Sequence, residues 1–128
     1  MRSVLLSSLI AGLPVFAPPA LAAEQFACTL REGCGTSDCG GDVVIRAILS
    51  PAATGWKLVL DDTTIGSFVE FDSSETARHF VSRDIDPDAG AAGLLSIFAK
   101  GEAFLSLHGN FMTPAAQTYT GRCTLETS

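Results

Sequence analysis

Residues 94–108, with the sequence LLSIFAKGEAFLSLH, decide the fold of this chain, because two apolar runs flank a short Lys-Gly break. Ile97-Phe98-Ala99 precede Lys100-Gly101, and Ala103-Phe104-Leu105 follow shortly after it. Apolar runs of strand length on either side of a glycine-containing turn are typical of a β-hairpin. We therefore expect strands over 94–99 and 103–108.

Similar short runs with a period of two occur along the rest of the chain. Val43, Ile45, Ala47 and Leu49 would share one face of a strand, while the residues between them would lie on the other. Asp61-Asp62 interrupts two further runs tightly and predicts a turn. The remaining strands are expected at 26–30, 43–49, 56–60, 65–71 and 117–125.

The segment Asp72–Arg83 fits two interpretations. Asp72 followed by Glu75 resembles a helix N-cap, and Ala77, Phe80 and Val81 have helical spacing. Alternation of Ala77, His79 and Val81 with their neighbours fits a strand equally well. We favour a strand, because strands are expected on both sides.

Seven or eight strands joined by short loops predict an all-β fold, a small antiparallel β-barrel or sandwich. Residues 1–22 are expected to be a signal peptide, with a basic start, an uncharged stretch from Val4 to Phe16 and small residues at Ala20 and Ala22. Residues 23–128 would then form a single antiparallel β domain. The exported protein would be periplasmic or secreted, with no membrane insertion after cleavage.

The 128 residues are 47% hydrophobic and carry 8 Lys or Arg against 14 Asp or Glu, a formal charge of −6. Loss of Arg2 with the signal peptide leaves 7 basic residues and a charge of −7. The apolar content argues against a disordered chain, and the acidic balance argues against nucleic acid as a partner.

The four cysteines are expected to form two disulfides, because a small exported domain benefits from cross-links. Three pairings exist. We favour Cys28 with Cys123, which would join the first and last strands, and Cys34 with Cys39, which would close a glycine-rich loop.

Metal sites are weaker interpretations of two segments. Cys28, Cys34 and Cys39 lack the Cys-x2-Cys spacing of zinc sites. Asp84, Asp86 and Asp88 alternate as in calcium loops, but Leu95 stands where the bidentate Glu would be required. A solvated turn is the simpler interpretation, and we expect no metal and no cofactor.

The two histidines, His79 and His108, are the candidate residues for acid–base chemistry. No Gly-x-Ser-x-Gly or His-Glu-x-x-His motif accompanies them. A catalytic role would require one of them to lie within hydrogen-bond reach of a Ser or a carboxylate. We expect no catalytic residue and no enzyme.

An acidic segment is the candidate binding site for a basic protein partner, because a surface of one sign steers association with the opposite sign. Ordinary solubility is the simpler explanation of the same residues. The segment comprises Asp61, Asp62, Glu70, Asp72, Asp84, Asp86 and Asp88. The aromatic residues are expected mostly in the core by alternation, among them Trp56, Phe68, Phe71, Phe80, Phe98 and Phe104.

Lys100-Gly101-Glu102-Ala103, followed by Phe104 to Leu107 and by Cys123 opposite Cys28, resembles the small periplasmic inhibitors of c-type lysozyme. The resemblance covers about a third of residues 23–128 and implies an antiparallel β-barrel with a disulfide between its first and last strands. The inhibitory Ser-Gly-x-x-Tyr signature of that family is missing, since the corresponding segment reads Ala89-Gly90-Ala91-Ala92-Gly93. The resemblance therefore implies the architecture and assigns no functional residue.

These patterns favour an exported, non-enzymatic β-barrel that binds a protein partner in the cell envelope. The alternative is a small-molecule carrier that uses the barrel interior. An enzyme of unknown class is the third hypothesis.

Overall fold

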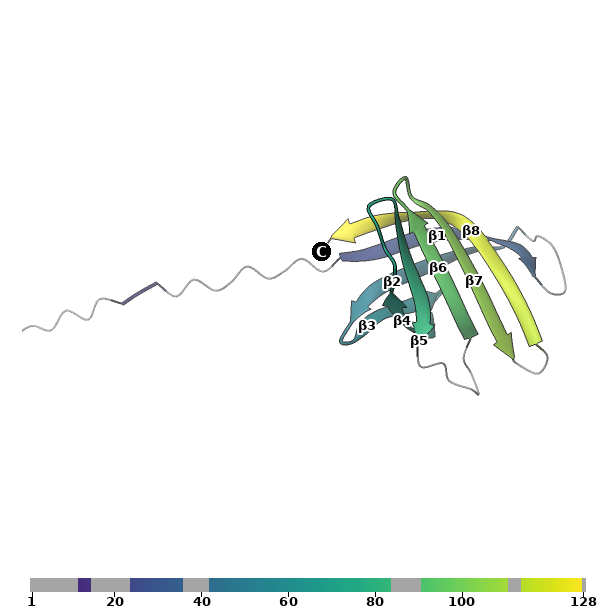
Figure 1. Ribbon diagram of the computed structural model, residues 1–128, viewed down its shortest axis with the longest axis horizontal. Helices are drawn as coiled ribbons and strands as arrows, with labels where there is room; N and C mark the ends of the chain where they lie inside the picture. Colours follow the sequence, from purple (N-terminus) through teal and green to yellow (C-terminus); the bar gives the residue numbers. More distant parts are fainter. Residues whose placement is uncertain (1–11, 15–23, 36–41, 84–90, 111–113, 128) are drawn as a thin grey trace, which may run out of the picture.

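Eight antiparallel strands close into a barrel in the computed structural model, in the order β1 to β8 around the barrel (Figure 1). The structure describes residues 12–14, 24–35, 42–83, 91–110 and 114–127. The all-β prediction is confirmed, and the fold is a barrel and not a sandwich. The strands are β1 (Glu24–Gly35), β2 (Val44–Ala52), β3 (Gly55–Leu60), β4 (Thr63–Glu70), β5 (Ala77–Arg83), β6 (Ala91–Phe98), β7 (Glu102–Asn110) and β8 (Pro114–Thr127).

The first and last strands close the barrel. β1 pairs with β8 along most of its length, and Cys28 lies opposite Cys123 in that register. A disulfide joins the two side chains, as predicted. The second predicted disulfide, Cys34–Cys39, lies outside the described residues because Cys39 does.

Segment 72–83 forms a strand only in its second half. β5 begins at Ala77, and residues 71–76 form the turn that enters it. Asp72 has a φ of 46°, a left-handed conformation that bends the chain. The Ser74 hydroxyl accepts a hydrogen bond from the Thr76 amide at 3.2 Å within this turn. The helix alternative is therefore wrong, since the polar residues that resembled an N-cap stabilise a turn between strands.

Both short turns expected from the sequence are present. Asp61 and Asp62 have φ values of 41° and 69°, as a two-residue hairpin turn between β3 and β4 requires. Asp61 also accepts a hydrogen bond from the Arg46 amide at 2.8 Å, which ties this turn to β2. Gly101 adopts a φ of 98° in the β6–β7 turn.

Inward-facing apolar side chains fill the middle of the barrel. Phe68, Phe80 and Leu95 are almost fully buried, together with Leu30, Leu49, Leu58 and Leu105. A Cβ at Gly93 would lie 2.9 Å from both Phe68 Cζ and Leu107 Cδ2. Glycine at position 93 therefore lets the Phe68 ring pack against the β6 backbone.

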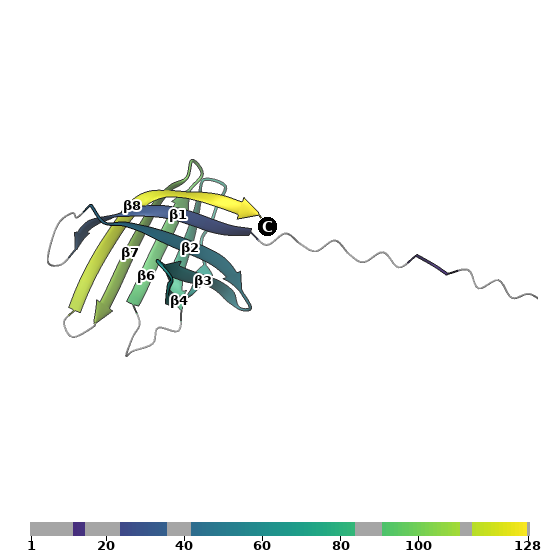
Figure 2. The same cartoon turned by 180° about the vertical axis from the view of Figure 1, so that it is seen from behind.

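The barrel has two ends that differ in content. The termini end carries the start of β1, the end of β8, the β4–β5 turn and the β6–β7 turn, and Figure 2 shows β1 and β8 meeting there from behind. The far end carries the β3–β4 turn and the starts of β6 and β8. No helix among the described residues is both long and apolar enough to span a membrane.

Replacement of both Cys28 and Cys123 by Ala should lower the free energy of unfolding by about 3–5 kcal/mol, because the bond closes a loop across nearly the whole domain. Urea titration followed by circular dichroism measures this change. A loss below about 1 kcal/mol would contradict a main role for the bond in restricting the unfolded chain.

Candidate functional site

The acidic segment is divided between the two ends of the barrel. Asp61 and Asp62 lie in the β3–β4 turn at the far end, whereas Glu70 and Asp72 lie at the termini end. Asp84, Asp86 and Asp88 lie outside the described residues. The described members therefore do not form one continuous surface, because antiparallel strands carry successive turns to opposite ends.

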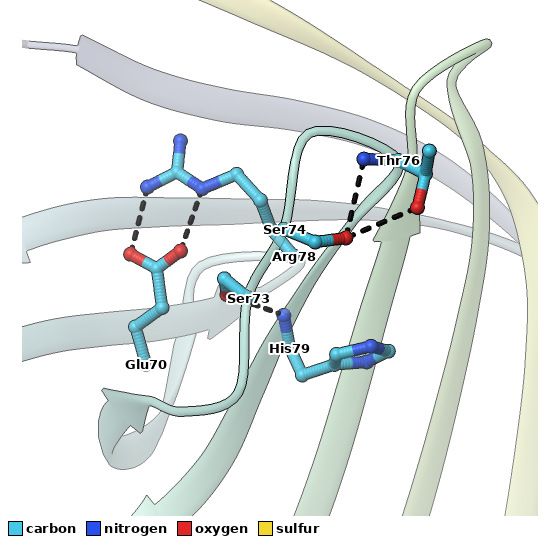
Figure 3. A network of polar contacts seen from close by, with 6 residues as sticks. All are labelled: Glu70, Ser73, Ser74, Thr76, Arg78 and His79. Atoms are coloured by element: carbon cyan, nitrogen blue, oxygen red, sulfur yellow. Dashed lines mark hydrogen bonds and ion pairs between the residues drawn. The ribbon is translucent and has the colours of Figure 1, made fainter.

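Arg78 and Glu70 form the best-defined polar contact at the termini end. Arg78 Nε and Nη2 donate hydrogen bonds of 2.7 and 2.8 Å to the two carboxylate oxygens of Glu70 (Figure 3). Both side chains are about one-third exposed or less. Such a two-point contact fixes the orientation of both groups. Glu70 is therefore engaged within the molecule and contributes little to an acidic docking surface.

The Arg78 guanidinium also covers an aromatic cluster at the termini end of the core. Its Cζ lies 5.0 Å from the ring centre of Phe26, 5.4 Å from that of Trp56 and 5.5 Å from that of Phe80. The three rings contact one another with centroids 5.2–6.2 Å apart. A cation over several ring faces is electrostatically favourable, so Arg78 closes the core at this end.

The ion pair shifts the protonation of both groups. Hydrogen bonds from Arg78 lower the pKa of the Glu70 carboxyl, while partial burial opposes that shift. The same hydrogen bonds raise the pKa of Arg78. Both residues are therefore charged at neutral pH.

Serine side chains hold the adjoining turn in place. Ser73 Oγ accepts a hydrogen bond from the His79 amide at 3.1 Å, and Ser74 Oγ lies 3.0 Å from Thr76 Oγ1 (Figure 3). The turn is thus anchored to the start of β5. This anchoring places Asp72 and Glu75 at the rim of the barrel, where both are exposed.

An aromatic strip crosses the outer face of the barrel at the same end. It consists of Phe71, His79, Phe98 and Phe104, whose successive ring centres lie 5.9, 6.4 and 5.9 Å apart. Phe71, Phe98 and Phe104 are 44%, 39% and 51% exposed. Exposed apolar side chains scattered singly are ordinary, whereas these rings form a contiguous row.

The prediction that these phenylalanines belong to the core is wrong for three positions. Ile97 and Leu105 point inward, so Phe98 and Phe104 point outward beside them. Each of these two phenylalanines is adjacent to an equally apolar residue, so alternation around the Lys100-Gly101 turn fits either neighbour facing inward. The sequence alone does not show which of two apolar neighbours faces the core.

A pocket of about 390 Å³ at the termini end reaches the barrel interior, because its lining includes the core residues Phe26 and Ile97. Its lining combines Phe98 from the strip with Arg78, Ser74 and Glu75, and it reaches Leu125 near the end of β8. Apolar walls with a few charged groups suit an inserted side chain of a partner.

His79 lies within hydrogen-bond reach of a serine, which is the geometry that a catalytic role would require. Its Nδ1 lies 2.9 Å from Ser96 Oγ across the β5–β6 pair. Within the described ranges, no carboxylate hydrogen-bonds the His79 ring, so the third member of a serine triad is not found there. His108 is exposed on the outer face of β7.

The structure bears differently on the zinc and calcium interpretations. Cys28 is bonded to Cys123, so a zinc site built from Cys28, Cys34 and Cys39 is excluded. The calcium interpretation of 84–88 lies outside the described residues. In the part of the chain that the structure describes, no group of three His, Cys, Asp or Glu side chains is placed to hold a metal ion.

No family model, curated protein or solved structure matches this chain.

Replacement of Arg78 by Met should lower the free energy of unfolding by about 1–2 kcal/mol, because it leaves the Glu70 carboxylate partly buried and removes the cation from the aromatic cluster. Urea titrations of R78M, E70Q and the double variant should give a coupling energy of about 1 kcal/mol. R31M, which breaks the exposed Arg31–Asp42 pair, is the matched control and should cost less than about 0.5 kcal/mol.

The lowered pKa of Glu70 also predicts a pH dependence. A carboxyl with a depressed folded-state pKa stabilises the fold above its ordinary pKa, and the contribution is lost as the pH falls through the folded-state value. Between about pH 5 and pH 3, wild-type protein should therefore lose more stability than E70Q. Urea titrations at several pH values measure the free energy of unfolding of both proteins. Equal losses of that free energy in wild type and E70Q over this range would contradict the role of Glu70.

Proposed function

We propose that this protein is an exported, non-enzymatic binding protein that docks a basic protein partner of the cell envelope on its aromatic strip. The observation that carries the proposal is the row of exposed rings formed by Phe71, His79, Phe98 and Phe104. Aromatic side chains dominate binding energies when a partner covers them, because each buries a large rigid area at low entropic cost.

Export rests on two features. Residues 1–22 have the features of a signal peptide, and the Cys28–Cys123 disulfide suits an oxidising compartment. Either the periplasm or the extracellular space meets that condition. A partner would therefore be an envelope or extracellular protein.

Charge favours a basic partner. The chain has a formal charge of −6, and Asp72 and Glu75 are exposed on the turn beside the strip. Arg122, which donates a hydrogen bond to the Lys100 carbonyl oxygen, lies opposite Glu102 in the β7–β8 register, so its positive charge has a negative charge beside it. Basic groups of the partner should therefore lie over the β4–β5 turn, and its apolar residues over the rings.

A binding experiment tests the aromatic strip. Purified protein is titrated with a panel of basic envelope proteins, beginning with c-type lysozyme because of the resemblance to its inhibitors. We expect a salt-sensitive complex at about 10 μM or below, and a loss of at least tenfold in affinity for F98A/F104A. V44A removes an exposed apolar side chain from β2, away from the strip, and should bind as wild type.

Circular dichroism and the unfolding midpoint of each variant show that a lost complex is not a lost fold. The proposal fails if no member of the panel forms a complex, or if F98A/F104A binds as tightly as V44A.

The acidic flank gives a separate prediction. D72N/E75Q should weaken the complex about three- to tenfold and flatten its dependence on salt, because two exposed charges beside the strip are removed. D42N/D62N removes two exposed charges from the far end and should leave affinity and salt dependence nearly unchanged. Equal effects of the two double variants, measured by titration at several salt concentrations, would show that only net charge matters.

A further inference from the structure

A cavity of about 270 Å³ opens inside the barrel at the far end, opposite the end that carries the aromatic strip. Inward-facing residues of β3, β4, β6, β7 and β8 line it. The lining includes Leu60, Ile65, Ala91, Leu107, Gln117 and Tyr119.

Small residues create this space. Ala91, Gly109 and Ala115 occupy lining positions near the strand ends, where larger side chains would fill the interior. The apolar residues below them remain partly buried and pack against the core without being covered by it. This group, Leu60, Ile65, Leu107 and Tyr119, lines the cavity. An apolar surface left open inside a barrel is the usual environment of a small ligand.

The floor of the cavity is closed. Leu107 approaches Gly93 so closely that a Cβ there would lie 2.9 Å from Leu107 Cδ2 and from Phe68 Cζ. Phe68 itself is fully buried. The packed core therefore limits the depth of the cavity, and a ligand of that volume would have on the order of ten non-hydrogen atoms.

Two polar side chains line the wall, Gln117 and Tyr119, and the Gln117 amide nitrogen already donates a hydrogen bond to the Gly33 carbonyl oxygen. The Tyr119 hydroxyl makes no hydrogen bond with any residue that the structure describes, although Tyr119 is half-buried. Burial raises the pKa of Tyr119, and the negative charge of Glu32, opposite it in the β1–β8 register, raises it further. The hydroxyl is thus a protonated donor, and the Glu32 carboxylate disfavours an anionic ligand nearby.

We propose that this far-end cavity binds a small, uncharged, mainly apolar molecule whose carbonyl or ether oxygen accepts a hydrogen bond from Tyr119. The site would give the carrier hypothesis a location and a ligand class. It is independent of partner binding on the aromatic strip, because the two sites lie at opposite ends and share no residue.

Three probes with one ring system test the ligand class. Equilibrium dialysis should show saturable binding of 2-acetylnaphthalene, weaker binding of naphthalene and the weakest binding of 2-naphthoate, which is anionic at neutral pH. Y119F should bind 2-acetylnaphthalene about three- to tenfold more weakly and leave naphthalene unaffected, because only the first probe carries an acceptor.

Two neighbouring substitutions test the location. A91L places a larger side chain in the cavity and should weaken both neutral probes at least tenfold, whereas A92L makes the same change on the outer face of β6 and should have no effect. Independently of any variant, nuclear Overhauser contacts should join the protons of the bound probe to the Leu60, Ile65 and Leu107 methyl groups.

The proposal is overturned if neither neutral probe binds saturably, if 2-naphthoate binds best, or if A91L binds like A92L. Nuclear Overhauser contacts to other residues would likewise overturn it. Failure here leaves partner binding untouched, since F98A/F104A and A91L alter different ends of the molecule.

Discussion

The pairing of β1 with β8 is the constraint on which the rest of the structure depends. It satisfies the backbone groups of both terminal strands and leaves the described sheet without a free edge. The Cys28–Cys123 disulfide makes this closure covalent. Closure in turn fixes which side chains face inward, because residues alternate between the two faces of a strand except where the register shifts, as between β3 and β4.

The interior is filled unevenly. At the termini end, Phe26, Trp56 and Phe80 fill the space, and Arg78 covers them while held by Glu70. At the far end, alanine and glycine at lining positions leave a cavity above Phe68 and Leu107. The described residues thus form one end with an aromatic cluster inside and aromatic rings on its outer wall, and another end whose cavity has a mainly apolar lining.

Much of the fold could be predicted from alternation and turn residues. The Lys100-Gly101 and Asp61-Asp62 turns separate strands as expected, and the two terminal strands are joined through Cys28 and Cys123. The first and last strands, predicted at 26–30 and 117–125, are longer in the structure, because the small and polar residues at the ends of β1 and β8 continue no apolar alternation.

The candidate sites were less predictable. Phe98 and Phe104 stand beside Ile97 and Leu105, so hydrophobicity alone does not show which neighbour faces outward. Contacts among Arg78, Phe26 and Trp56 join three strands that are distant in sequence. Only the register between those strands brings the residues together.

The position of the disulfide has a mechanical consequence. The start of β1 and the end of β8 lie at the same end of the barrel, so a force that pulls the termini apart opens their hydrogen bonds one pair after another. This opening begins at Glu24 and Thr127 and is stopped by the covalent bond at Cys28 and Cys123. Tension then passes from Cys28 to Cys123 through the disulfide, and strands β2 to β7, which lie between these two residues in the chain, carry no load.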